Sequence, residues 1–185
     1  MSIPNILTLF RIALVPVLVV VYYLPWEWSS YAAGAIFALA GFTDWLDGFF
    51  ARRFNSESSL GAFLDPVADK IMVAVTLVLL LETYCSVWIA IPAMVIISRE
   101  IIISALREWM AELGQRASVG VSYIGKVKTT AQMGAIMLLL IQVPKWGLIP
   151  VIVAYTMLYM SVALTLYSMM IYIKAAWPYL TSSSK

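Results

Sequence analysis

Long stretches without charge dominate this sequence and limit what it can fold into. The clearest one runs from about Leu148 to Ile173 and contains no charged residue. A helix needs roughly 20 mostly apolar residues to cross a bilayer, so this stretch is long enough to span one. The chain is 63% hydrophobic, which leaves too little polar surface to cover a water-soluble core. The other apolar stretches run approximately from Ile12 to Trp26, Tyr31 to Phe42, Ile71 to Ile97 and Ala131 to Ile141.

We predict an all-α fold, a polytopic membrane bundle of six transmembrane helices. Breaks at Pro25, at Cys85-Ser86 and at Pro144 divide the apolar stretches into spans. The predicted spans cover approximately residues 5–25, 30–53, 62–83, 87–112, 124–143 and 147–175. Apart from a short polar tail, the sequence has no repeat or low-complexity tract. Residues 1–185 are therefore expected to form a single membrane domain.

The lysines and arginines outside the spans gather on one side of the predicted bundle. With six spans, both ends of the chain and alternate loops share that side. It carries Arg52, Arg53, Arg107, Arg116, Lys126, Lys128, Lys174 and Lys185, while the opposite turns carry only Lys145. Cytoplasmic loops of membrane proteins carry an excess of lysine and arginine. We therefore expect both termini and the two longer loops to be cytoplasmic.

All four aspartates of the chain lie in one window, residues 43–70. Asp44 and Asp47 are three apart and Asp65 and Asp69 are four apart, so each pair lies on one helical face. A short loop joins the two helices, so we expect antiparallel neighbours whose carboxylates face each other near the cytoplasmic end. A charged side chain at membrane depth costs at least about 2.5 kcal/mol, so four of them must be paired or bound to metal.

The chemistry of these side chains points to a metal site. Four carboxylates so close together repel one another unless cations lie between them. The sequence has no histidine and a single cysteine, and oxygen ligands alone favour hard cations such as Mg²⁺ or Mn²⁺. Mg²⁺ commonly bridges carboxylates to substrate phosphates, and two ions suit an in-line displacement at phosphorus. We therefore predict two ions held by Asp44, Asp47, Asp65 and Asp69.

The neighbours of the aspartates suit a phosphate-bearing ligand, although each also has a structural interpretation. Gly48 would let a flat or bulky ligand approach the backbone, or it would serve only helix packing in lipid. Arg52 could pair with a phosphate or an aspartate, or act as a topology charge. Gly61 offers a second close approach, and Asp65 before Pro66 could be only a helix N-cap.

The spacing of these residues resembles the signature of the CDP-alcohol phosphatidyltransferases. The matching pattern is Asp44-x2-Asp47-Gly48-x2-Ala51-Arg52-x8-Gly61-x3-Asp65-x3-Asp69. Three further stretches are similar to bacterial members of that family: PNILTLFR at 4–11, REIIISALREWMAELG at 99–114 and GKVKTTAQ at 125–132. The resemblance covers nearly the whole chain. It implies six transmembrane helices in the bacterial inner (cytoplasmic) membrane, usually as a homodimer, with no nucleic-acid partner.

The resemblance also implies a reaction and a set of roles. A phosphatidyl group would pass from CDP-diacylglycerol to a small polar alcohol, and CMP would leave. Asp44, Asp47 and Asp65 would bind metal, and Asp69 would lie near the metals and act as general base. The residues that would hold CDP-diacylglycerol are Gly48, Arg52, Ser58 and Gly61, with the segment that includes Asn5 and Thr8.

A polar pocket beyond the aspartates must bind the acceptor alcohol. The mixed fourth span brings Arg107, and the loop after it adds Arg116, Lys126 and Lys128. Arg11, early in the first span, is expected to face the same cavity. So many cations suit an acceptor that carries a phosphate, such as glycerol 3-phosphate, and the resemblance points the same way. Alternatively, these cations meet lipid phosphates or enforce topology.

Three other functions are compatible with parts of this sequence. Inositol phosphate or serine as the acceptor would leave the chemistry unchanged. A divalent-cation transporter is an alternative of another class, but transporters commonly show paired halves with interrupted helices near the bilayer midplane. Here the aspartates lie in one pair of helices. A structural or assembly protein would have no reason to hold four aspartates together. Metal-dependent nucleotide release distinguishes the enzyme, transporter and structural classes, and an acceptor screen with CMP as the readout separates the acceptors.

Overall fold

The protein is all-helical in the computed structural model, which describes residues 3–54, 59–112, 123–141 and 147–182. Each helix falls on one of the six ranges predicted from the sequence, and the last one continues beyond its predicted end. The helices are α1 (Ile3–Tyr23), α2 (Ser29–Phe54), α3 (Ser59–Tyr84), α4 (Val87–Glu112), α5 (Tyr123–Leu140) and α6 (Leu148–Ser182). The prediction of an all-α fold is therefore confirmed.

A two-residue connection between α3 and α4 shows how the sequence sets a helix boundary. Cys85 has a positive φ of 41°, and its backbone N–H donates to the carbonyl of Leu81 at 3.0 Å. Ser86 then caps the N-terminus of α4, since its hydroxyl accepts a hydrogen bond from the backbone N–H of Trp88 at 3.3 Å. The break predicted at this dipeptide is confirmed, whereas the one at Pro144 lies outside the described residues.

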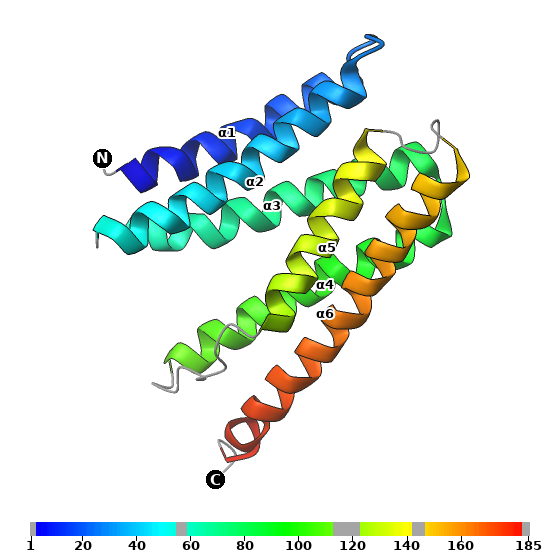
Figure 1. Cartoon of the computed structure of the whole chain (residues 1–185). Helices are drawn as coiled ribbons and strands as arrows, with labels where there is room; N and C mark the ends of the chain where they lie inside the picture. Colours follow the sequence, from blue (N-terminus) through cyan, green and yellow to red (C-terminus); the bar gives the residue numbers. More distant parts are fainter. Residues whose placement is uncertain (1–2, 55–58, 113–122, 142–146, 183–185) are drawn as a thin grey trace.

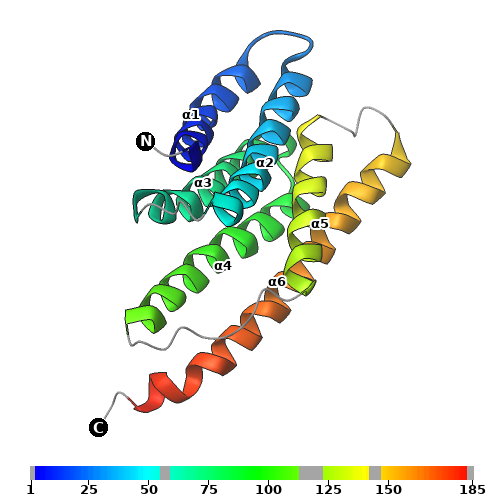
Figure 2. The same cartoon turned by 60° about the vertical axis from the view of Figure 1, so that its left-hand side comes forward.

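The helices pack in two groups that α5 links. The hairpin of α1 and α2 lies beside α3, and α1 contacts both of these helices (Figure 1). In the second group α6 packs on α4 and α5, as the turned view also shows (Figure 2). α5 also contacts α2 and α3, and α3 contacts α4. As a result, α2, α3 and α5 surround the middle of the molecule, with α1 and α4 on either side.

The molecule is apolar outside as well as inside. A continuous core of aliphatic and aromatic side chains runs between the helices, and it includes Leu18, Phe37, Leu80, Ile96 and Ile136. Large apolar side chains are also exposed on the outer faces, among them Val20, Trp88, Ile101 and Ile149. Water-soluble monomers rarely expose apolar surface on this scale, and such a surface suits contact with lipid.

Three of the described helices are long and apolar enough to cross a membrane. The qualifying segments are Ile6–Tyr23, Val87–Glu112 and Leu148–Tyr179. The apolar part of α5, Val127–Leu140, is shorter. α2 and α3 carry the four aspartates, which reduce their mean hydropathy.

Candidate active site

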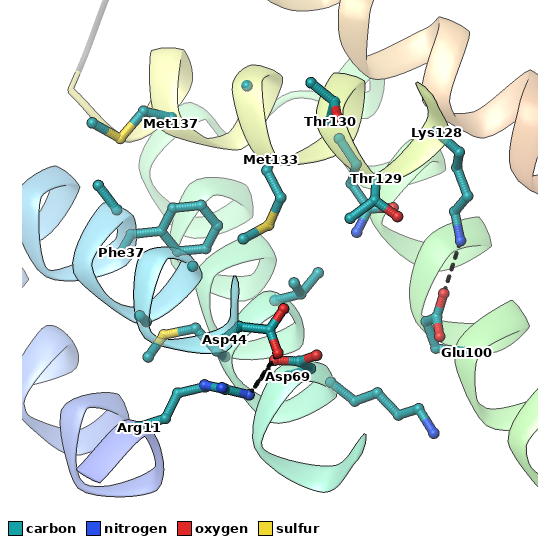
Figure 3. Close-up of a pocket in the computed structure, with 18 residues that line it drawn as sticks. Arg11, Phe37, Asp44, Asp69, Glu100, Lys128, Thr129, Thr130, Met133 and Met137 are labelled. Atoms are coloured by element: carbon teal, nitrogen blue, oxygen red, sulfur yellow. Dashed lines mark hydrogen bonds and ion pairs between the residues drawn. The ribbon is translucent and has the colours of Figure 1, made fainter. Parts of the chain in front are cut away.

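Two of the aspartates meet at a buried arginine. Nη1 of Arg11, on α1, lies 3.1 Å from Oδ1 of Asp44 on α2 and 2.7 Å from Oδ1 of Asp69 on α3. The arginine side chain is 1% exposed, whereas the two aspartate side chains are 44% and 47% exposed. A buried guanidinium requires such partners, because an unpaired charge away from water is costly. Figure 3 shows the three side chains converging from three helices.

These side chains form one end of a cavity of about 700 Å³. Its polar part contains the aspartates, and its apolar part lies along Phe37, Met133 and Met137 (Figure 3). All the helices except α6 contribute to the wall. The wall residues are Arg11, Phe37, Ala38, Ala40, Gly41, Asp44, Asp69, Lys70, Met72, Val73, Glu100, Lys128, Thr129, Thr130, Gln132, Met133, Gly134 and Met137.

A second ion pair forms another part of the wall. Nζ of Lys128, on α5, lies 2.9 Å from Oε1 of Glu100 on α4. The same carboxylate also accepts a hydrogen bond from Arg99, which in turn donates to the hydroxyl of Ser168 on α6 at 3.2 Å. Both cations are at least nine-tenths buried. The chain of contacts fixes an ammonium group in the cavity wall, apart from the aspartate pair (Figure 3).

The structure separates the cations predicted to bind the acceptor. Arg11 and Lys128 both line the cavity. Arg107 is exposed and does not: its guanidinium donates to the hydroxyl of Tyr172 and lies 4.7 Å from the centre of that ring. Thr8, predicted to contact CDP-diacylglycerol, is buried on α1 one turn before Arg11.

Most of the remaining predicted residues lie outside what the structure describes. Ser58 and Arg116 are outside the described residues altogether. Only the backbone is described for Asn5, Asp47, Gly48, Arg52, Gly61, Asp65 and Lys126. Among side chains that are described, no three Asp, Glu, His or Cys groups gather as metal ligands. Of the four aspartates of the predicted site, the structure therefore describes the side chains of Asp44 and Asp69.

The carboxylates of Asp44 and Asp69 are placed so that a cation can lie between them. The Oδ1 atoms of Asp44 and Asp69 come from different helices, yet both lie within 3.1 Å of the same positively charged nitrogen. Carboxylate oxygens are the ligands that hard divalent ions prefer. Both aspartates are also partly exposed in the cavity, so an ion could reach them.

Several residues of the cavity wall were not predicted from the sequence. Lys70 lines the cavity and donates to the hydroxyl of Ser104 across the α3–α4 contact. Thr129, Thr130 and Gln132 follow Lys128 along the start of α5. Their signal was present in the sequence, because Lys70 adjoins Asp69 and the other three belong to the GKVKTTAQ stretch.

Comparisons with known proteins identify the family of this chain. The family model for CDP-alcohol phosphatidyltransferases matches residues 1–171. The chain belongs to the CDP-alcohol phosphatidyltransferase family. Proteins named CDP-diacylglycerol--glycerol-3-phosphate 3-phosphatidyltransferase are similar to it along nearly their whole length. One from Shigella flexneri serotype 5b (strain 8401) is 55% identical over 175 residues, covering 95% of this chain and 94% of that protein. One from Escherichia coli (strain K12) is 54% identical over 178 residues, with the same coverage.

Membership of the CDP-alcohol phosphatidyltransferase family gives the cavity a chemical context. The first and last aspartates of the signature, Asp44 and Asp69, lie in its wall. In this phosphatidyltransferase they come from consecutive helices joined by a short connection, as the spacing predicted. The polar part of the cavity therefore contains two aspartates of the family's sequence signature.

Proposed function

We propose that this protein transfers the phosphatidyl group of CDP-diacylglycerol to sn-glycerol 3-phosphate, giving phosphatidylglycerophosphate and CMP. The observation that carries the proposal is the shared cavity of Asp44, Asp69 and Lys128. Such a cavity can hold a reacting phosphate at one side and a phosphorylated acceptor at the other. The names of relatives that are 54% and 55% identical support the same reaction. The reaction is a step of phospholipid biosynthesis.

Divalent metal would be held by Asp44, Asp47, Asp65 and Asp69, in our proposal as two Mg²⁺ or Mn²⁺ ions. When bound, such ions neutralise the negative charge of the pyrophosphate and of the leaving oxygen. The convergence of Asp44 and Asp69 on one cationic nitrogen supports this assignment. The absence of histidine and of a cysteine cluster in the sequence favours hard, oxygen-bound cations.

Asp69 is proposed to act as the general base. Its carboxylate would take the proton of the acceptor hydroxyl, whose oxygen forms a bond to the phosphorus that carries diacylglycerol. The bond from that phosphorus to the bridging oxygen breaks, and CMP takes the electron pair. Arg11 contacts both Asp44 and Asp69, so it would hold their carboxylates in place through this exchange.

Two groups of residues would bind the substrates. Gly48, Arg52, Ser58, Gly61 and the segment of Asn5 and Thr8 are proposed to hold CDP-diacylglycerol. Lys128 and Arg11 would hold the phosphate of the acceptor, since both line the cavity. Arg107, Arg116 and Lys126 are proposed for the same anion. Arg107 has less structural support than Arg11 and Lys128, because its side chain is exposed and contacts Tyr172.

The proposed setting is the bacterial inner membrane. The whole chain, residues 1–185, would form one domain with six transmembrane helices, both termini cytoplasmic and the active site at the cytoplasmic end. The excess of lysine and arginine on one side of the bundle supports this orientation. A homodimer is proposed on family resemblance.

Purified protein in detergent, given CDP-diacylglycerol, glycerol 3-phosphate and Mg²⁺, tests the function directly. We expect CMP and phosphatidylglycerophosphate in equal amounts and no CMP after chelation. Serine and inositol phosphate in place of glycerol 3-phosphate should give little CMP. If no acceptor gives CMP release, the proposed reaction is wrong.

The variant Asp69→Asn tests the base. It keeps the size of the side chain but cannot accept the proton, so CMP release should fall about 10²-fold or more. Binding of CDP-diacylglycerol should be retained. Substantial CMP release by this variant with Mg²⁺ present would remove the base assignment while leaving the overall reaction intact.

A further inference from the structure

Arg99 is a buried cation of α4 to which the mechanism above gives no role. Its side chain is 10% exposed and does not line the cavity. Its Nη1 donates to Oε1 of Glu100, and its Nη2 donates to the hydroxyl of Ser168 on α6 at 3.2 Å. A charged side chain away from water is costly unless other groups match its charge. The contacts of Arg99 therefore show where its positive charge acts.

A single carboxylate oxygen, Oε1 of Glu100, receives two cations. Nη1 of Arg99 contacts it from the same helix, and Nζ of Lys128 contacts it from α5 at 2.9 Å. One carboxylate carries one negative charge, so these three side chains together have a net charge of one positive unit. Glu100 and Lys128 line the cavity and point toward each other in Figure 3, whereas Arg99 is bound to α6 instead. The extra positive charge thus lies directly behind the cavity wall.

This part of the wall would have no net charge without Arg99. Glu100 and Lys128 alone form a neutral pair, and the carboxylate, which is 26% exposed, would repel a phosphate that the ammonium group attracts. The guanidinium of Arg99 offsets the carboxylate from the side away from the cavity, so the attraction of the ammonium group remains. Water screens charges less in a partly buried site, so a single charge has a measurable effect here.

We propose that Arg99 is a positioning residue that offsets the charge of Glu100, so that Glu100 holds Lys128 in place without cancelling its attraction for the acceptor phosphate. This inference rests on the proposed function, in which Lys128 binds that phosphate. The other cations that line the cavity have different contacts: Arg11 pairs with the two aspartates, and Lys70 donates to Ser104.

The variant Arg99→Met tests the role of this charge, with initial rates of CMP release as the readout. We expect KM for glycerol 3-phosphate to rise about tenfold, because the group around Lys128 becomes neutral. The rise should be smaller than in Lys128→Met, which also loses the direct contact with the phosphate. KM for CDP-diacylglycerol should be unchanged, since its pyrophosphate is proposed to bind at the aspartates.

A double variant separates the charge of Arg99 from its packing. Arg99→Met combined with Glu100→Gln restores a net charge of one positive unit, and the new amide oxygen can still accept a hydrogen bond from Lys128. KM for glycerol 3-phosphate should return to within about threefold of the wild-type value, because the two changes are coupled. A purely structural role of Arg99 predicts no such recovery, since the second substitution removes a further native contact.

Ser168→Ala is the matched control. It removes the other hydrogen bond of Arg99 and leaves all three charges in place. KM for glycerol 3-phosphate should stay within about twofold of the wild-type value, even if the thermal unfolding temperature falls. Thermal unfolding in detergent shows for each variant that the protein is folded.

Three results would overturn the assignment of Arg99. A folded Arg99→Met variant could keep the wild-type KM for glycerol 3-phosphate. It could raise the KM values of both substrates equally, which would indicate a general distortion of the cavity. The double variant could have a KM for glycerol 3-phosphate about tenfold above wild type or higher, a result that counts even if Arg99→Met alone does not fold. A wild-type protein that releases no CMP with glycerol 3-phosphate refutes instead the proposed function.

Discussion

At the scale of single residues, the site depends on a charge balance around Arg11. Its guanidinium is buried, and its Nη1 contacts both Asp44 and Asp69, whose side chains are nearly half exposed. One positive charge cannot neutralise two carboxylates, so the cluster keeps a net negative charge facing the cavity. This remaining charge attracts a divalent cation to the partly exposed carboxylates.

Replacing Arg11 by methionine tests this balance. We expect Arg11→Met to lower the free energy of unfolding by about 1–3 kcal/mol in chelator, less than a fully buried pair because the aspartates reach solvent. Mg²⁺ should reduce the loss, since a divalent ion can take the place of the missing charge. Thermal unfolding in detergent measures both, with the exposed Lys174→Met as control. A loss of equal size with and without Mg²⁺ would contradict the idea.

Two of the three described cations in the acceptor prediction, Lys128 and Arg107, should differ in their effect on KM for glycerol 3-phosphate. Lys128→Met should raise KM for glycerol 3-phosphate about tenfold to a hundredfold, because it removes a charge-assisted hydrogen bond inside the cavity. Arg107→Gln should have a smaller effect, because Arg107 is exposed and stacks on Tyr172. Initial rates of CMP release at varied glycerol 3-phosphate decide the order. The reverse order would place Arg107 at the acceptor.

At the scale of helices, α5 is the element that joins the two halves of the site. It carries Lys128 and Gln132 into the cavity, contacts α2 and α3, and packs along α6. Close packing against α2 depends on Gly34, where an added Cβ would lie 2.5 Å from Cγ2 of Ile141. At Gly134 an added Cβ would meet instead the mobile end of Met157.

This difference predicts opposite effects of the same substitution. Gly34→Ala should lower stability by about 1 kcal/mol, because the cost of overpacking against a branched side chain exceeds the gain in helix propensity. Gly134→Ala should be neutral or slightly stabilising, because the methionine side chain can move away. Thermal unfolding of both variants under one set of detergent conditions measures the difference. If Gly34→Ala is at least as stable as Gly134→Ala, the close contact between α2 and α5 is not tight.

At the scale of the whole molecule, apolar side chains cover the outer faces and polar ones gather in the cavity. This arrangement suits lipid as the surrounding solvent. It does not by itself give the orientation, which rests on the distribution of lysine and arginine along the chain. The connection between α3 and α4 is the natural place to test it, because it contains the single, exposed Cys85.

A membrane-impermeant maleimide applied to intact spheroplasts should label Cys85, since the proposed topology puts the α3–α4 connection outside. The variant Cys85→Ser with a cysteine introduced by Ser184→Cys should be labelled only after the membrane is opened, because the C-terminus is proposed to be cytoplasmic. The opposite pattern of labelling would invert the topology and place the aspartates at the wrong face for a cytoplasmic acceptor.

The sequence predicted the secondary structure well, because long apolar stretches bounded by proline or by Cys85-Ser86 leave little choice of helix boundary. It also predicted that Asp44 and Asp69 face a common space, since their spacing and the short connection determine the geometry. Asp47 and Asp65 remain predictions, because their side chains are outside the described set.

The residues that sequence reasoning could not place are those whose environment depends on helix packing. Charge alone does not distinguish Lys128, which points into the cavity, from Arg107, which lies against Tyr172. The pairing of Arg11 with aspartates of two other helices likewise requires the tertiary structure. Gln132 belongs to the GKVKTTAQ stretch, but only the packing of α5 shows that its side chain lines the cavity.

The contact of Arg11 with Asp44 and Asp69 bears on how the protein is made. The chain emerges from the ribosome N-terminus first, so α1 enters the membrane before the two acidic helices. Inserting an aspartate into lipid is unfavourable, and a nearby positive charge reduces that cost. The counter-ion for both carboxylates is thus already in the bilayer when they arrive. Arg11 is translated before Asp44 and Asp69, so each acid enters the bilayer after the residue that will pair with it.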